Sequence, residues 1–317
     1  MPIGDGQPES KVRLARRASL VAAGARSSAG RYPTYLADLL RGKGAATHGR
    51  EELDAQWKHL TQAPSSTGLQ AALWLGHNSV FLAVDGMTIL LDPVLGERIG
   101  VRIPGVTVGP SRLLPRVDTA HLPRADVILI SHAHFDHLDV PTLKALANRH
   151  TTVITAAETA DLIPRGFGSV QELEWGKSLR LGTLTITALR PNHWGARTMW
   201  DRHRGFNAYL VESPHARWLY AGDTAMTRNL HGLGELDLSI FGIGAYNPWI
   251  HAHANPEQVW EMSSANKSAR LLPVHHSTFR LSDEPVHEPL ERLAVAAGAK
   301  AERIVPATLG EIIRFGH

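Results

Sequence analysis

The feature that most restricts the fold of this chain is a short apolar strand that runs directly into a group of histidines and aspartates. Residues 126–139 read Asp-Val-Ile-Leu-Ile-Ser-His-Ala-His-Phe-Asp-His-Leu-Asp. Side chains alternate along an extended chain, so His132 and His134 face the same side, and the turn that follows can carry Asp136 and His137 to a second centre. Burying four such groups together is costly unless a cation receives them. The segment therefore predicts a metal site at the end of a buried strand.

Composition narrows the choice of metal ligands. The 317 residues include 18 histidines and no cysteine, which excludes disulfides, thiol nucleophiles and thiolate-bound metals. Imidazole and carboxylate ligands suit zinc, iron or manganese. The formal net charge of +3 is too small to indicate a nucleic-acid partner. No apolar run is long enough to span a bilayer, and we expect a cytoplasmic protein.

The positive charge is concentrated at the N-terminus. Residues 1–50 hold nine Lys and Arg against three Asp and Glu, so this part carries +6 and the remainder −3. We expect an N-terminal arm over residues 1–65 and one folded domain over residues 66–317. A solvated tail is the favoured interpretation of the arm, ahead of an export segment. Contact with anionic lipid, which would make the protein membrane-associated, is the main functional alternative. Nucleic-acid binding comes last, because the domain is slightly acidic. The basic residues that would meet lipid are Lys11, Arg13, Arg16 and Arg17.

After residue 65, short apolar runs alternate with turn residues, which is typical of β-strands. Two β-rich halves, with helices between and after them, predict two packed sheets with helices on the outer faces. Residues 96–123 are rich in Pro, Gly and Arg, and we expect them to be irregular. Asn255 and Pro256 suit a helix cap and a first helical residue. The expected strands are 71–75, 79–84, 88–91, 126–130, 178–189, 207–212, 217–220, 238–241 and 271–274, and the expected helices are 35–40, 51–60, 139–150, 256–265 and 288–297.

The spacing His-x-His-x-Asp-His after a buried strand resembles the metallo-β-lactamase superfamily, whose fold is an αββα sandwich with the metal site at one edge. Later segments match further ligands of that family in order: Pro-Asn-His-Trp at 191–194, Ala-Gly-Asp-Thr at 221–224 and Pro-Val-His-His-Ser-Thr-Phe at 273–279. The resemblance implies two divalent metal ions bridged by one aspartate, with zinc expected ahead of iron or manganese. His276 is the alternative to His275, which matches the family's His-x-x-Thr-Phe. The implied ligands are His132, His134, His193 and Asp223 for one metal, and Asp136, His137, Asp223 and His275 for the other.

Several segments resemble the branch of the superfamily that hydrolyses N-acylphosphatidylethanolamine as a phospholipase D, together with its bacterial relatives. They include Trp-Leu-Gly-His-Asn-Ser at 74–79, Leu-Asp-Pro at 91–93, Ile-Gly-Ala-Tyr at 243–246 and His-Ala-Asn-Pro-Glu at 253–257. The resemblance covers about residues 70–290 and implies a phosphodiesterase that attacks a phospholipid with a hydroxide bridging the two metals. Asn78 and the pair His276-Ser277 depart from the branch, so a lactonase or other ester hydrolase is the alternative. A non-catalytic metal- or lipid-binding protein is less favoured, and a homodimer is left open.

Five residues in or around the ligand set receive further roles. Asp136 and His253 are the expected catalytic residues. His253 matches a family histidine near the substrate phosphate, where it would donate a hydrogen bond or protonate a leaving group. Asp92 is either an acceptor that fixes the tautomer of a ligand imidazole or the turn that ends a strand. His77 is interpreted as a buried, hydrogen-bonded histidine, with a place in the site lining as the alternative. Tyr246 is expected in the substrate pocket, against the common alternative that an aromatic residue belongs to the core.

Overall fold

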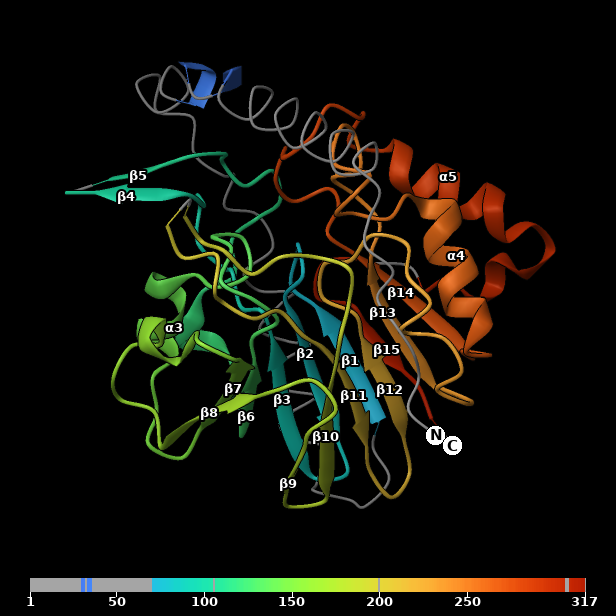
Figure 1. The fold of residues 1–317 in the computed structure, drawn as a ribbon, viewed down its shortest axis with the longest axis horizontal. Helices are drawn as coiled ribbons and strands as arrows, with labels where there is room; N and C mark the ends of the chain where they lie inside the picture. Colours follow the sequence, from blue (N-terminus) through green and yellow to red (C-terminus); the bar gives the residue numbers. More distant parts are fainter. Residues whose placement is uncertain are drawn as a thin grey trace.

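The computed structural model describes residues 30–31, 33–35, 70–104, 106–198, 200–305 and 308–316. Two β-sheets lie face to face, with one helix outside the first sheet and two helices outside the second (Figure 1). This is the αββα sandwich that the sequence predicted. Of the expected N-terminal arm, only residues 30–31 and 33–35 are described, and they are helical. The expected helix at 51–60 and the domain boundary at residue 65 lie outside the described residues.

The first sheet has seven strands in the order β15-β1-β2-β3-β6-β7-β8. Neighbours from β15 to β3 are antiparallel, and neighbours from β3 to β8 are parallel. Because β3 and β6 are parallel neighbours, Asp92 and Ser131, which come shortly after them, lie at the same edge of the sheet. The bounds are β1 Gln70–Trp74, β2 Val80–Val84, β3 Met87–Leu91, β6 Val127–Leu129, β7 Thr152–Ala156, β8 Ser169–Leu173 and β15 Ile312–Arg314.

The second sheet has six strands in the order β14-β13-β12-β11-β10-β9. The strands β12, β13 and β14 are parallel, and the remaining neighbours are antiparallel. The segments that follow β12 and β14 therefore begin at one edge of this sheet. The bounds are β9 Ser178–Leu181, β10 Leu184–Leu189, β11 Ala208–Glu212, β12 Arg217–Tyr220, β13 Leu238–Gly242 and β14 Arg270–Val274.

Two of the helices begin at polar caps. The side chain of Asp139 accepts the backbone N–H of Thr142 at the start of α3, and Asn255 and Gln258 cap α4 reciprocally. The hairpin β4–β5 extends away from both sheets (Figure 1). Within the described residues, no helix is both long enough and apolar enough to cross a membrane. The bounds are α3 Val140–Leu146, α4 Pro256–Ala265, α5 Glu288–Ala297, β4 Val101–Ile103 and β5 Val106–Val108.

The two sheets divide the core into three parts, because consecutive residues of a strand point to opposite faces. Trp74 of β1 and Trp218 of β12 pack in the layer between the sheets. Their neighbours in sequence face outward: Leu73 packs on the side of α3, and Leu219 packs on the side of α4 and α5. Both faces of both sheets are thus buried, which leaves the sheet edges as the places where polar side chains can gather.

The expected elements occur with a few corrections. The helices α4 and α5 and the strand β12 have the expected bounds, whereas 178–189 is a hairpin that turns at Gly182 with positive φ. The helix expected over 139–150 ends at Leu146, since the Asn148 side chain accepts the N–H of His150 and closes a turn instead. The strands β4, β5, β7, β8 and β15 were not predicted, and the region 96–123 is therefore not wholly irregular.

Candidate metal centre

The polar side chains of the centre reach it from loops at one edge of both sheets. From the first sheet, the turn between β1 and β2 carries His77, and residues 131–139 follow β6. From the second sheet, His193 follows β10, Asp223 follows β12 and His275 follows β14. Residues that are far apart in the sequence meet because the two sheets pack face to face.

One cluster contains three imidazoles and Asp223. The Nε2 atom of His132 lies 2.7 Å from Nδ1 of His134, and Nε2 of His193 lies 3.3 Å from the same atom. The other ring nitrogen of His193, Nδ1, donates to the carbonyl of Ala252 at 3.0 Å. A neutral imidazole that is protonated on one nitrogen presents a lone pair at the other. Lone pairs therefore converge on one point, as in a metal site.

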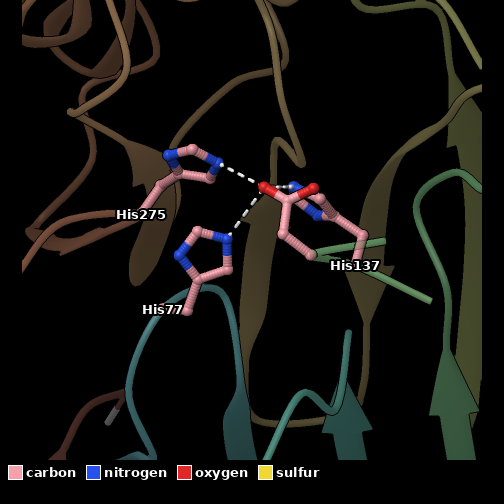
Figure 2. Close-up of side chains that lie close together, drawn as sticks. His77, His137 and His275 are labelled. Atoms are coloured by element: carbon pink, nitrogen blue, oxygen red, sulfur yellow. Dashed lines mark hydrogen bonds and ion pairs between the residues drawn. The ribbon is translucent and has the colours of Figure 1, made fainter. Parts of the chain in front are cut away.

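A second cluster gathers around one carboxylate oxygen (Figure 2). The Nε2 atoms of His77, His137 and His275 lie 3.1, 3.6 and 3.3 Å from Oδ2 of Asp136. One ligand atom from each of these four residues lies within 4.8 Å of the others. His77 is thus buried and hydrogen-bonded, as the sequence suggested, and it also belongs to the cluster.

Asp223 lies between the two clusters. Its Oδ2 atom is 3.0 Å from Nε2 of His137 in one cluster and 3.7 Å from Nε2 of His193 in the other. His253 approaches the same oxygen, with Nδ1 at 3.7 Å. The oxygen is buried and makes no hydrogen bond of sound geometry, although buried polar atoms are normally paired. An unpaired carboxylate oxygen surrounded by imidazole nitrogens fits cations bound on either side of it.

Asp92 orients two of the imidazoles, His137 by a direct hydrogen bond and His132 through Ser131. Nδ1 of His137 donates to Asp92 Oδ2 at 2.6 Å, and the Tyr220 hydroxyl donates to the same oxygen at 2.5 Å. Ser131 donates its backbone N–H to Oδ1 at 2.7 Å and its hydroxyl to Oδ2. The Ser131 hydroxyl in turn accepts from Nδ1 of His132 at 2.9 Å. These bonds direct the Nε2 atoms of both histidines into the centre.

Burial and neighbouring charges give the groups of the centre different protonation states. Burial lowers the pKa of His77 to about 3 and that of His134 to about 4. Burial opposes the charged form of His137 too, but the carboxylates of Asp223 and Asp136 outweigh it and raise the pKa of His137 well above its usual value. Burial likewise disfavours the charged form of Asp223, yet His137 and other imidazoles hold its pKa well below the usual range. Without metal the carboxylates of Asp136 and Asp223 are therefore ionised, and His137 is a positively charged imidazolium.

Of the two adjacent histidines after β14, His275 faces the clusters. The ring of His276 stacks on Trp74 instead, with the ring centroids 4.9 Å apart. Tyr246, expected in the substrate pocket, contacts the start of α5 in the structure. Its hydroxyl donates to Glu288 at 2.7 Å, and its ring is buried, so it joins the loop after β13 to the start of α5.

Several contacts of the centre could not be found from the sequence. Asn78, noted only as a departure from the family, donates its amide to Oδ1 of Asp223 at 3.3 Å. Tyr220 ends an apolar strand, so it resembles a core residue, and Ser131 stands next to the ligands without a pattern of its own. Their partners come from distant parts of the chain, and only the packing of the sheets brings them together.

Comparison with known proteins agrees with this geometry. Residues 87–276 match the family model described as a beta-lactamase superfamily domain. An uncharacterized protein of Mycobacterium tuberculosis is 34% identical over 247 residues, which are 72% of this chain and 64% of that protein. The N-acyl-phosphatidylethanolamine-hydrolyzing phospholipase D 1 of Caenorhabditis elegans is 28% identical over 275 residues, which are 78% of this chain and 76% of that one.

Among solved structures, a metallo hydrolase of the archaeon Ignicoccus hospitalis superposes with a TM-score of 0.59 at 18% identity, covering 78% of this chain and 99% of that one. The chain spans about 64% of the length of its mycobacterial relative. The region matched by the family model runs from β3 to His276 and so contains every residue of the two clusters except His77. With the fold, the order of the strand-end loops and this match in agreement, the chain belongs to the beta-lactamase superfamily and has its metallo-β-lactamase fold.

Proposed function

We propose that this protein is a metal-dependent hydrolase with a two-metal centre, and that it cleaves a phosphodiester of a phospholipid such as N-acylphosphatidylethanolamine. The observation that carries the proposal is the position of Asp223 Oδ2 between an imidazole cluster and a mixed imidazole–carboxylate cluster. His77 belongs to the second cluster, through its contact with Asp136. The residues that would hold the ions, expected to be zinc, are His132, His134, His193 and Asp223 for one, and Asp136, His137, Asp223 and His275 for the other.

Bound divalent ions supply Lewis-acid chemistry, which acidifies water and stabilises the negative charge that develops on the attacked group. The residues of the chain orient the components. Asp92 keeps the ring proton of His137 on Nδ1, so that Nε2 is directed inward. Burial lowers the pKa of His253 to about 4, so this histidine is neutral at pH 7. A neutral imidazole donates a hydrogen bond to a phosphoryl or leaving-group oxygen more readily than it delivers a full proton, which favours the first of its two expected roles.

Two observations support the substrate class. The first is the similarity to the C. elegans phospholipase. The second is an aromatic rim beside the centre, where the ring of Trp194 stacks on His193 with centroids 4.6 Å apart and is 37% exposed. The ring centroids of Trp249 and Trp194 lie 6.3 Å apart, and Ile250, which follows Trp249, is 38% exposed. Apolar side chains open to solvent next to a polar centre suit an amphiphilic substrate, with the phosphodiester at the centre and the acyl groups along the rim.

The test is hydrolysis of N-acylphosphatidylethanolamine in mixed micelles by metal-stripped protein reloaded with zinc. We expect phosphatidate and an N-acylethanolamine, identified by mass spectrometry, and we expect a chelator or the Asp223→Ala variant to abolish both products. Opening of lactones or simple esters without cleavage of the phosphodiester would leave a metal-dependent hydrolase with another substrate class. A zinc-loaded protein that cleaves none of these compounds would overturn the proposal.

A further inference from the structure

Arg197 touches the loop that carries three of the proposed ligands, without belonging to either cluster. One nitrogen of its guanidinium, Nη1, donates to the carbonyl of Ala133 and to the carbonyl of Leu138, each at 2.8 Å. The guanidinium carbon also lies 4.0 Å from the centroid of the Phe135 ring. Ala133 and Leu138 are fully buried, so both acceptors lie in the interior, where a carbonyl without a partner is costly.

The two carbonyls stand at the ends of the segment that contains His134, Asp136 and His137. Inside this segment the backbone folds as a turn, with the N–H groups of His137 and Leu138 both donating to the carbonyl of His134 at 3.1 and 2.9 Å. The guanidinium thus spans the turn from outside and fixes how far apart its ends lie. The two protons of a single Nη nitrogen suit two carbonyls, and the flat face of the group suits the Phe135 ring.

Arg197 also connects this turn to a second ligand segment. It lies four residues after His193, in the stretch that leads from β10 to β11. Near the other end of that stretch, Phe206 pairs with His132 in an isolated antiparallel bridge, and Asn207 donates its N–H to the carbonyl of Ser131 at 2.8 Å. The 190–207 stretch therefore contacts the ligand turn in two ways. The backbone of Phe206 and Asn207 pairs with His132 and Ser131, just before the turn, and the Arg197 side chain binds the carbonyls at the two ends of the turn.

The stretch itself is folded tightly. A Cβ atom at Gly195 would overlap the carbonyl oxygens of Arg204 and Gly205. The Asp201 side chain accepts the N–H of Thr198 at 2.6 Å and the Nε–H of Arg204 at 2.7 Å. Arg197 is consequently presented from closely packed, hydrogen-bonded residues on either side of it, so its position can set the geometry of the turn that it contacts.

We propose that Arg197 is a positioning residue for the metal centre, which fixes the ligand turn of residues 133–138 and holds it against the segment that carries His193. This inference rests on the proposed function, since it assigns Arg197 to the same centre. Among the described residues, the hydrogen bonds of the Arg197 guanidinium go to the carbonyls of Ala133 and Leu138 and to no proposed ligand side chain. It acts through the backbone on the directions of His134, Asp136 and His137.

The experiment compares Arg197→Ala with Arg303→Ala. Arg303 is a matched control, because its guanidinium also donates to a backbone carbonyl, that of Ser268, with Nε at 3.0 Å, and also lies over an aromatic ring, that of Trp260 at 4.9 Å. It sits beside α4 and contacts neither ligand segment. Metal affinity is measured by competition with a chromophoric chelator, and ligand geometry by the visible absorption of the cobalt(II)-loaded protein.

We expect Arg197→Ala to bind zinc about 10- to 100-fold more weakly, the range found when partners of metal ligands are removed. Its cobalt spectrum should differ from that of the wild type, and millimolar guanidinium chloride should restore both properties while ammonium chloride does not. Arg303→Ala should keep the wild-type affinity and spectrum even where its melting temperature falls. Arg197→Lys keeps the charge but loses the flat face, so an intermediate affinity is expected.

Wild-type affinity and spectrum in Arg197→Ala would overturn the inference, as would an equal loss in Arg303→Ala. If Arg197→Ala does not fold, the cobalt spectrum of Arg197→Lys decides, and an unchanged spectrum in that variant counts against a positioning role. Failure of the proposed function is distinguishable. In that case the wild-type protein itself binds no metal or hydrolyses nothing, whereas failure of this inference leaves a metal-loaded, active wild type whose Arg197 variants bind metal normally.

Discussion

A single carboxylate, Asp92, decides which nitrogen of His137 faces the centre. Replacing it with asparagine keeps the shape but removes one of the two carboxylate oxygens that accept hydrogen bonds, so the proton of His137 is no longer held on Nδ1. We expect Asp92→Asn to lower metal affinity by about 10- to 100-fold, measured by chelator competition. Asp126→Asn is the control, because Asp126 accepts from Thr88 and pairs with Arg124 at the start of β6, away from the centre. Equal affinities in the two variants would contradict the role of Asp92.

The adjacent pair His275 and His276 allows a direct comparison of a proposed ligand with a packing residue. His275→Ala should remove one metal equivalent per chain and nearly all hydrolysis, because a ligand is lost. His276→Ala should keep the metal content while lowering the free energy of unfolding by about 1–3 kcal/mol, since the stacking on Trp74 is lost. Metal content by atomic emission and unfolding in urea measure these effects. The reverse pattern would show that His276 is the ligand.

At this scale the sequence predicted the residues of the centre better than their environment. The spacing in 131–139 and the later strand ends identify residues that the structure brings together. The acceptor of the His193 ring proton, the carbonyl of Ala252, and the carbonyls gripped by Arg197 carry no sequence signal, because any residue has a carbonyl. The contact of Tyr246 with Glu288 likewise carries no sequence signal, because a tyrosine suits both a pocket and a core.

Among the connecting elements, the turn between β1 and β2 positions His77 and depends on Gly76. Gly76 has φ +95°, and a Cβ atom there would overlap Nη2 of Arg112. Arg112 is itself buried, and it donates to the carbonyls of Leu75, Val94 and Pro115. The turn is therefore fitted around a guanidinium that binds three separate segments of the backbone.

Gly76→Ala should consequently combine backbone strain with a clash. Gly86→Ala is the control, because Gly86 also has positive φ but a Cβ atom there meets nothing within 4 Å. We expect a loss of about 1–2 kcal/mol in Gly86→Ala from strain alone. Gly76→Ala should lose more than this and also bind metal more weakly, because His77 is displaced. Equal losses measured by urea unfolding, with unchanged metal affinity, would mean that Arg112 moves aside freely.

Elements with strong local signals were predicted, and elements defined by distant partners were not. The helix α4 has a capping box and a proline at its first position, and β12 is bounded by turn residues, so both were located. The strand β15 has only three residues and exists because it pairs with β1 at the other end of the domain. The hairpin β4–β5 likewise owes its form to pairing between two three-residue runs, which periodicity cannot detect.

For the molecule as a whole, the centre sets how the stability of the metal-free protein depends on pH. Four histidines have pKa values lowered to about 3 or 4: His77, His134, His253 and His276. Below about pH 6.5 the unfolded chain therefore takes up protons that the folded one does not, and the free energy of unfolding decreases as the pH is lowered. His137 and His275 have raised pKa values, so their contribution is complete below about pH 6.5 and is lost as pH rises through the folded values.

The metal-free protein should therefore be most stable near neutral pH and less stable on both sides. Zinc held by the proposed ligands His137 and His275 would displace their protons, so the loss of stability on the alkaline side should be smaller in the zinc-loaded protein. Urea unfolding at pH 5, 7 and 9, with chelator or with zinc, measures both effects. A metal-free protein whose stability rises steadily to pH 9 would contradict the assignment of raised pKa values to these two histidines.

The basic arm was expected to remain solvated or to meet anionic lipid, and we retain lipid contact as a proposal for the whole molecule. Removing residues 1–29 deletes Lys11, Arg13, Arg16 and Arg17 but keeps Arg31, which pairs with Asp283. Hydrolysis of a soluble substrate should be unchanged, while binding to anionic vesicles should weaken, most clearly at low salt, where basic side chains contribute about 1 kcal/mol each. Equal vesicle binding by the shortened protein in co-sedimentation would exclude a membrane role for the arm.

The residues of the two clusters are spread from His77 near the start of the described domain to His275 near its end, and this spacing has a consequence for synthesis in the cell. A ribosome releases the chain from its N-terminus, so the second cluster stays incomplete until β14 and the loop after it have emerged. A growing chain offers an ion only part of its ligands. Loading of the proposed centre would thus follow the synthesis of most of the domain.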